Sequence, residues 1–125
     1  MQVCTHLMFQ DGRAREAVER YVSLIPGSAI ESIEGDDGPG QTITFHLGGT
    51  PYFAFDSPPM HEFGFTPSTS IFALLDDRAD VDRVFGELSS GDGSVLMPVG
   101  EYAFNPHYGW CVDQHGVSWQ VGLAT

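Results

Sequence analysis

The chain has 125 residues, a length that suits one domain with a hydrophobic core of its own. Its 17 acidic residues outnumber five basic ones, all of them arginine, and the formal net charge is -12. A surface of this sign repels phosphate backbones and anionic lipid headgroups, so we expect neither nucleic acid nor a membrane as a partner.

Targeting signals and disulfides are not indicated by the sequence. No apolar run approaches the roughly 18 residues of a membrane span, and the first residues lack the basic and apolar regions of a signal peptide. We therefore expect a cytoplasmic protein. Two cysteines, Cys4 and Cys111, are too few for a disulfide framework, and reduced core thiols are favoured, although a bridge between them stays open.

The first half predicts one strand, one helix and three further strands. Residues 3–9 alternate as in a strand buried on both faces, and Asp11 is expected to cap the helix that follows. Pro26-Gly27 ends that helix. The apolar residues at helical spacing are Ala14, Ala17, Val18, Tyr21 and Ile25. The further strands are expected over residues 28–33, 42–47 and 52–55, with a hairpin at Gly48-Gly49.

The second half follows a segment, residues 57–68, whose proline, glycine and polar residues are typical of a linker. A strand is expected over residues 70–75, then a helix capped at Asp76-Asp77. The buried stripe of that helix is Val81, Val84, Phe85 and Leu88. Three further strands are expected. The first covers residues 94–99, the second begins at 101–104 and continues over 108–112 after an interruption at Asn105-Pro106, and the last covers 117–123.

The two halves repeat one another. Phe9-Gln10-Asp11 precedes the first helix as Leu75-Asp76-Asp77 precedes the second, an offset of about 65 residues, and such repeats bury sheet faces that one copy alone leaves open. We predict one α+β domain of two βαβββ units, about 1–56 and 69–125, joined by 57–68. They are expected to form a curved mixed sheet with the helices on its convex face and a pocket on its concave face.

The closing segment of the chain carries a family resemblance. The distinctive stretches are Gly93-Ser94-Val95-Leu96-Met97-Pro98, Tyr108-Gly109-Trp110, and Gly116-Val117-Ser118-Trp119-Gln120. The chain resembles the PhnB-like branch of the vicinal-oxygen-chelate superfamily, which includes glyoxalase I, extradiol dioxygenases and bleomycin-resistance proteins. The resemblance covers essentially the whole chain and implies the glyoxalase-like fold. Some relatives carry a methyltransferase label, but no glycine-rich loop opens a helix to hold a nucleotide-like methyl donor.

The resemblance also implies where a metal would bind. Catalytic members hold one divalent metal, such as zinc, iron or manganese, on the concave sheet, where it acts as a Lewis acid. The four ligand positions fall near Cys4, Ala54, Ser70 and Gln120 in this sequence. Alanine cannot bind a metal, and neutral serine and glutamine oxygens are weak ligands, so we expect no tightly held metal.

The residues that we expect to bind a ligand follow from the strand faces and from the resemblance. Cys4 and His6 share one face of the first strand, so either could point inward. Gln120 occupies a ligand position of the family, and its amide can orient a polar molecule. The full candidate set is Cys4, His6, Ser70, Phe72, Tyr108, Trp110 and Gln120. No residue of the set has an assigned catalytic role.

Three functions remain open at this point. The first is a metal-free module that binds a small, aromatic or cationic molecule, and it is favoured by the aromatic content, the negative charge and the weak metal ligands. The second is a lyase, isomerase or dioxygenase that depends on a divalent metal. The third is a structural dimerisation module. A homodimer is expected under all three, because two-fold dimers are the commonest oligomers.

Overall fold

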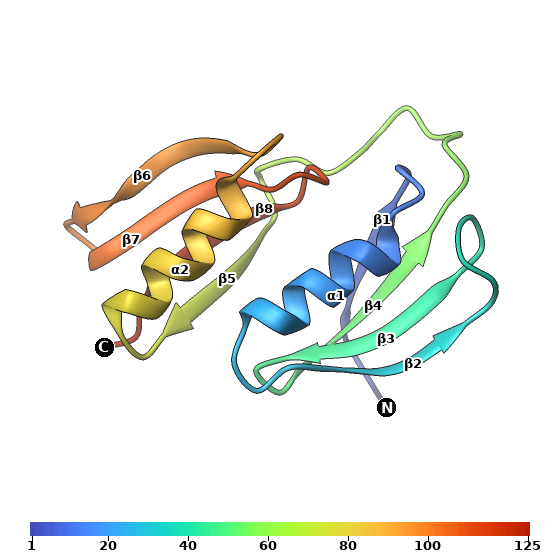
Figure 1. The fold of residues 1–125 in the computed structure, drawn as a ribbon, viewed down its shortest axis with the longest axis horizontal. Coiled ribbons are helices and arrows are strands. Elements are labelled where there is room, and N and C mark those ends of the chain that lie inside the picture. The colour runs from blue at the N-terminus through green and yellow to red at the C-terminus, as the bar shows by residue number, and fades with distance from the viewer. The chain divides into compact units, whose positions relative to one another are not determined.

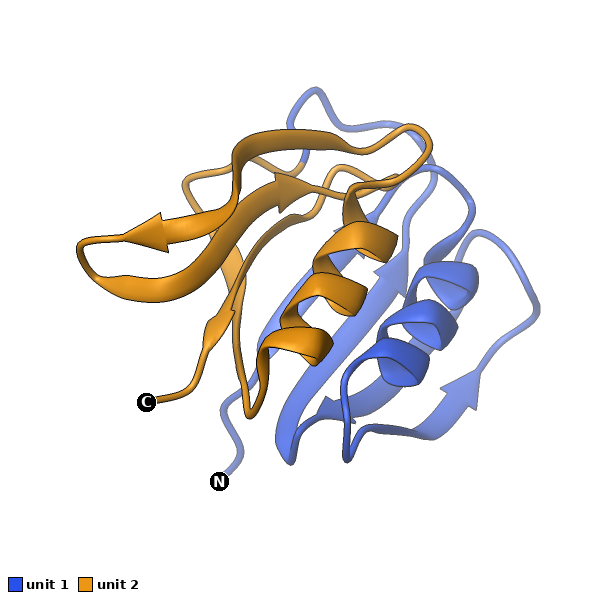
Figure 2. Ribbon diagram, turned by 60° about the vertical axis from the view of Figure 1, so that its left-hand side comes forward, with its two compact units in different colours: residues 1–64 blue, residues 65–125 orange.

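The computed structural model describes all residues from 1 to 125, and they divide into unit 1, residues 1–64, and unit 2, residues 65–125 (Figure 2). Each unit consists of one helix and one four-stranded sheet. The division falls inside the segment expected to be a linker. Neither helix is long and apolar enough to cross a membrane.

Unit 1 has the predicted order of one strand, one helix and three strands (Figure 1). The elements are β1 (Thr5–Phe9), α1 (Ala14–Leu24), β2 (Ala29–Glu34), β3 (Thr42–Leu47) and β4 (Thr50–Asp56). The sheet order is β1-β4-β3-β2, in which β1 and β4 are parallel and the other pairs antiparallel. Gly48 and Gly49, with φ of 55° and 90°, form the predicted hairpin turn because glycine adopts positive φ without a steric penalty.

Unit 2 repeats this topology (Figure 1). Its elements are β5 (Ser70–Leu75), α2 (Arg78–Ser89), β6 (Ser94–Tyr102), β7 (Asn105–Val112) and β8 (Ser118–Leu123). The sheet order is β5-β8-β7-β6, in which β5 and β8 are parallel, as β1 and β4 are in unit 1. The predicted α+β fold of two βαβββ units is therefore confirmed, with the strands arranged as two four-stranded sheets.

Each helix covers one face of the sheet in its own unit (Figure 2). In unit 1 the buried side chains of α1, among them Val18 and Tyr21, lie over a sheet face that contributes Ile43 and Phe45. In unit 2 the predicted stripe of α2 is buried, on the side of the sheet that holds Trp119 and Val121. Side chains alternate along a strand, so every second residue lies on the opposite, helix-free face.

Three local predictions were wrong. Asp11 does not cap α1: its Oδ1 accepts the N–H of Arg13 at 2.9 Å, and the turn at Gly12, with φ of 73°, starts the helix later. Cys4 and His6 are exposed rather than buried, because α1 covers only the opposite face of that sheet. The strand expected to begin at residue 101 begins at Asn105 instead, because β6 continues to Tyr102 and the side chain of Asn105 bonds the N–H and C=O of Leu123.

Candidate functional site on the helix-free face of unit 2

Five of the predicted site residues lie on one face of the sheet in unit 2. Alternation along the strands places Ser70 and Phe72 of β5, Gln120 of β8, and Tyr108 and Trp110 of β7 on the side opposite α2. Trp110 pairs with Gln120, and Gln120 pairs with Phe72, so an aromatic residue flanks the glutamine on each neighbouring strand.

Four hydrogen bonds join the polar side chains of this face into a chain. The hydroxyl of Tyr108 donates to Oε1 of Gln120, whose Nε2 donates to Oγ of Ser70 at 3.2 Å. The two hydroxyl oxygens of Ser70 and Ser118 lie 2.7 Å apart. Nε1 of Trp110 donates to Oγ of Ser118 at 2.8 Å. We call these five residues, Tyr108, Gln120, Ser70, Ser118 and Trp110, the polar chain.

Ser118 is the member of the polar chain that sequence reasoning missed. It is only 1% exposed and pairs in register with Ser70 on the neighbouring parallel strand. Its place two residues before Gln120 was a usable signal, because residues i and i+2 of a strand share a face. A candidate set built from Gln120 by this rule would have included it.

Two aromatic rings pack against Tyr108. The centroid of its ring lies 4.8 Å from that of Phe104 and 5.7 Å from that of Tyr102, both in edge-to-face geometry. Burial, and to a smaller extent the neighbouring Tyr102, raises the pKa of the Tyr108 phenol above its usual value. The phenol therefore remains a hydrogen-bond donor to Gln120 at neutral pH.

The apolar part of this face is open. Phe72 and Leu74 of β5 are 57% and 49% exposed, although both are large and apolar. None of the residues that register places on this face of β5, β7 and β8 carries a formal charge: they are Ser70, Phe72, Leu74, Tyr108, Trp110, Val112, Ser118, Gln120 and Gly122. The face therefore combines exposed apolar side chains with neutral polar groups.

His6 lies on the corresponding face of unit 1. It pairs in register with Phe53, and their rings stack at 5.4 Å, with Phe55 at 6.4 Å. Cys4 precedes β1 and is exposed, so it is not the core thiol that the sequence suggested. Cys111 is buried on the α2 side, and both cysteines are free.

The internal repeat tests the ligand positions that the family implies. Phe72 pairs with Gln120 in unit 2 as His6 pairs with Phe53 in unit 1, so Phe53 is the counterpart of Gln120. Ala54, one residue further, is fully buried on the side covered by α1. The residue of unit 1 that corresponds to Gln120 is therefore a phenylalanine, and neither Phe53 nor Ala54 has a side chain that can bind a metal.

The donor set does not fit a metal centre. The amide of Gln120 and the hydroxyl of Ser70 are neutral and already bond to one another. No group of three or more His, Cys, Asp or Glu side chains in the structure is placed to hold a metal ion. Divalent transition metals in catalytic sites are held by about three such ligands.

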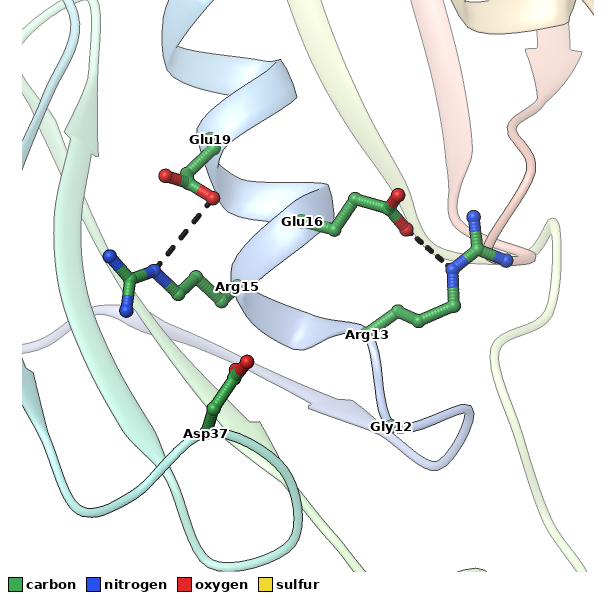
Figure 3. Close-up of a pocket in the computed structure, with 6 residues that line it drawn as sticks. All are labelled: Gly12, Arg13, Arg15, Glu16, Glu19 and Asp37. Carbon is green, nitrogen blue, oxygen red and sulfur yellow. Dashed lines mark hydrogen bonds and ion pairs between the residues drawn. The ribbon is translucent and has the colours of Figure 1, made fainter.

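A surface hollow of about 480 Å³ lies elsewhere, at the start of α1 (Figure 3). Its lining is charged: Arg13 pairs with Glu16 and Arg15 with Glu19, at 2.5 and 3.8 Å, and Asp37 lies across from them. These ion pairs are largely exposed, and such pairs need no ligand to explain them. The hollow contains none of the predicted site residues, so we place the candidate site on the polar chain.

Comparison with known proteins gives the same architecture. The family described as 3-demethylubiquinone-9 3-methyltransferase has a sequence model that matches residues 1–122. A PhnB protein from Bacillus cereus is 39% identical, with a TM-score of 0.90, and the match covers 99% of this chain and all of that one. Protein PA1353 from Pseudomonas aeruginosa is 26% identical, with a TM-score of 0.82, over 98% of this chain and 97% of that one.

A more distant structure shows the fold alone. A glyoxylase/bleomycin resistance protein/dioxygenase domain from Frankia sp. EAN1pec has a TM-score of 0.68 at 13% identity, covering 100% of this chain and 98% of that one. No curated protein is significantly similar to the chain in sequence.

Proposed function

The chain belongs to the PhnB-like family of the vicinal-oxygen-chelate superfamily, and on that premise we propose that it binds a small molecule on the helix-free face of unit 2 without a tightly held metal. The observation that carries this proposal is the polar chain beside the exposed side chains of Phe72 and Leu74. A few placed polar groups within an apolar surface are typical of small-molecule sites.

The polar chain supports a binding role better than a purely structural one. A sheet face left to water carries single polar side chains that bond to solvent, whereas here four bonds fix five side chains relative to one another. Side chains that are already ordered lose little rotamer freedom when a ligand binds. Large apolar side chains beside them gain by being covered.

The reaction named in the family's description has no counterpart among the residues of this chain. A nucleotide-like methyl donor is typically held by a glycine-rich loop that opens a helix. The turn before α1 holds the single glycine Gly12, and α2 follows Asp76-Asp77. We therefore propose ligand binding rather than methyl transfer.

¹H–¹⁵N correlation NMR tests the proposal, because the indole N–H signals of the two tryptophans report on opposite faces of the same sheet. Nε1 of Trp110 belongs to the polar chain, whereas Nε1 of Trp119 donates to Asp113 in the core at 3.0 Å. A panel of small aromatic compounds is added to ¹⁵N-labelled protein. We expect binders to move the indole signal of Trp110 and leave that of Trp119 in place.

Variants make the assignment specific. Gln120→Leu is expected to weaken every such binder, whereas Gln2→Leu, an exposed glutamine outside the sheets, is expected to leave affinity unchanged. Binders that instead move signals around Gly12 and Asp37 would assign the site to the hollow and contradict the proposal. A panel that moves no signal of the helix-free face would contradict it as well.

A further inference from the structure

The polar chain has a direction that follows from counting its hydrogens. The indole N–H of Trp110 can only donate, so Ser118 Oγ is an acceptor in that bond. One hydrogen is shared between Ser118 and Ser70, and one serine hydrogen is therefore left over. If it belonged to Ser118, which is 1% exposed, it would be buried without an acceptor, at a cost of about 1–3 kcal/mol.

The spare hydrogen therefore belongs to Ser70. Ser118 donates to Ser70, and Ser70, which is half-buried, keeps its own O–H for a partner outside the chain. The amide of Gln120 has the same property: one of its two N–H groups donates to Ser70 and the other is free. Its oxygen is already taken by the phenol of Tyr108.

The face thus offers two neighbouring donors, and it offers them without a charge. The residues that register places on this face of β5, β7 and β8 include no Lys, Arg, His, Asp or Glu. A charged ligand group would lose its hydration here without gaining an ionic partner, which is unfavourable. A neutral oxygen with two lone pairs matches two neutral donors.

Gln120 has an aromatic residue beside it on each of the two neighbouring strands. Phe72 and Trp110 occupy the register positions on either side of Gln120. Each neighbouring strand lies about 4.8 Å away, so the two positions are about 10 Å apart, which suits a single flat ring.

We infer that this face recognises a neutral, planar carbonyl compound, whose carbonyl oxygen accepts from the Ser70 hydroxyl and the Gln120 amide while its ring covers Phe72 and Trp110. The inference rests on the proposed function and adds the chemical class of the ligand to it. It disfavours the cationic ligand that the net charge suggested, because β5, β7 and β8 place no acidic residue on this face.

Four probes of similar size separate the possibilities. Acetophenone carries the neutral carbonyl, ethylbenzene lacks the oxygen, benzylamine is a cation and benzoate is an anion. Each is titrated into ¹⁵N-labelled protein while the indole signal of Trp110 is followed, with that of Trp119 as an internal reference. We expect acetophenone to bind tightest.

Variants of Ser70 identify the donor. Ser70→Ala is expected to weaken acetophenone about fivefold, the equivalent of one neutral hydrogen bond, and to leave ethylbenzene unchanged. Ser70→Thr keeps the hydroxyl and should retain most of the affinity. Ser94→Ala, at an exposed serine that begins β6, is the matched control.

The possible results test the ligand class separately from the proposed binding function. Equal binding of acetophenone and ethylbenzene, unaffected by Ser70→Ala, would overturn the inference and leave the binding face intact. Tighter binding of benzylamine or benzoate would do the same. If no probe moves the Trp110 signal, both the inference and the proposed function are overturned.

Discussion

Ser70 and Ser118 lie 48 residues apart in the sequence, and their hydroxyl oxygens are 2.7 Å apart in the structure. The parallel pairing of β5 with β8 places them opposite one another at the start of both strands. This pair connects the half of the polar chain that holds Trp110 to the half that holds Gln120 and Tyr108.

Ser118→Ala should therefore break the polar chain at its middle. The indole of Trp110 loses its acceptor and Ser70 loses one partner, so we expect the free energy of unfolding to fall by about 1–2 kcal/mol. Urea denaturation measures this loss, and Ser94→Ala provides the control with an expected change below about 0.5 kcal/mol. Equal stability of the two variants would mean that the polar chain contributes nothing to folding.

Gly109→Ala should destabilise unit 2 through a steric clash. A Cβ at Gly109 would lie 2.6 Å from Cε1 of Phe85 and 2.9 Å from a methyl group of Val99, and overpacking of this kind costs about 1–3 kcal/mol. Gly86→Ala is the matched comparison, because nothing lies within 4 Å of its added Cβ. As alanine is the better helix former, Gly86→Ala should gain about 0.5–1 kcal/mol. If thermal unfolding showed that both variants change the stability in the same direction, the packing of α2 on β7 would be contradicted.

Asp56 should make stability depend on pH. The residue is 1% exposed and its Oδ1 has no hydrogen-bond partner, so burial raises the pKa of the carboxyl group. The nearby Asp11 and Asp37 also raise this pKa, whereas the hydrogen bond from the Ala14 N–H lowers it. A raised pKa in the folded state favours the protonated form. The contribution of Asp56 to stability is therefore full below the pKa of about 3.9 that an aspartate has in the unfolded chain. It is lost as the pH rises through the higher pKa of Asp56 in the folded chain.

Asp56→Asn removes this titration. We expect the wild type to gain stability relative to Asp56→Asn as the pH is lowered from 7 towards 4. Urea denaturation at several pH values measures the difference. Two parallel profiles would show that Asp56 titrates alike in the folded and unfolded chains.

The two thiols should react very differently. Cys4 is exposed, whereas Cys111 is buried, and burial together with the nearby Asp113 raises the pKa of its thiol to about 12. Because the thiolate is the reactive form, a disulfide reagent at pH 8 should modify one thiol per native chain and two after denaturation. Cys4→Ser should abolish the native reaction and Cys111→Ser should preserve it. A fast native reaction that survives in Cys4→Ser would contradict the burial of Cys111.

Much of the fold could be read from hydrophobic periodicity. The stripe of Val81, Val84, Phe85 and Leu88 predicted α2 and its buried face, and the strands over residues 42–47 and 70–75 have the bounds expected from the sequence. Periodicity could not show at which residue α1 begins or that it lacks a side-chain cap, because this depends on the backbone conformation of Gly12. Nor could it show that Asn105 joins β7, which depends on bonds to Leu123, 18 residues away.

The sequence predicted which residues share a sheet face, but not which of them are hydrogen-bonded to one another. Alternation and family resemblance led to Gln120, Ser70 and Trp110, and the structure places them on one side of one sheet. Their bonds to one another depend on strand register, which a single sequence does not specify for β5 and β8. Alternation from Gln120 could have placed Ser118 on this face, but only the register shows that it lies opposite Ser70. Register also shows that Phe53, and not Ala54, is the residue of unit 1 that corresponds to Gln120.

In the proposed function, the helix-free face of unit 2 recognises its ligand by hydrogen bonds from the polar chain rather than through a metal. Elemental analysis by mass spectrometry, on protein purified without chelators or metal-affinity resin, measures whether a metal is present. We expect far less than one equivalent of any transition metal per chain, with the same content in Gln120→Leu. One full equivalent of a single metal, lost in Gln120→Leu, would contradict the proposed function and make a metal-dependent enzyme the better interpretation.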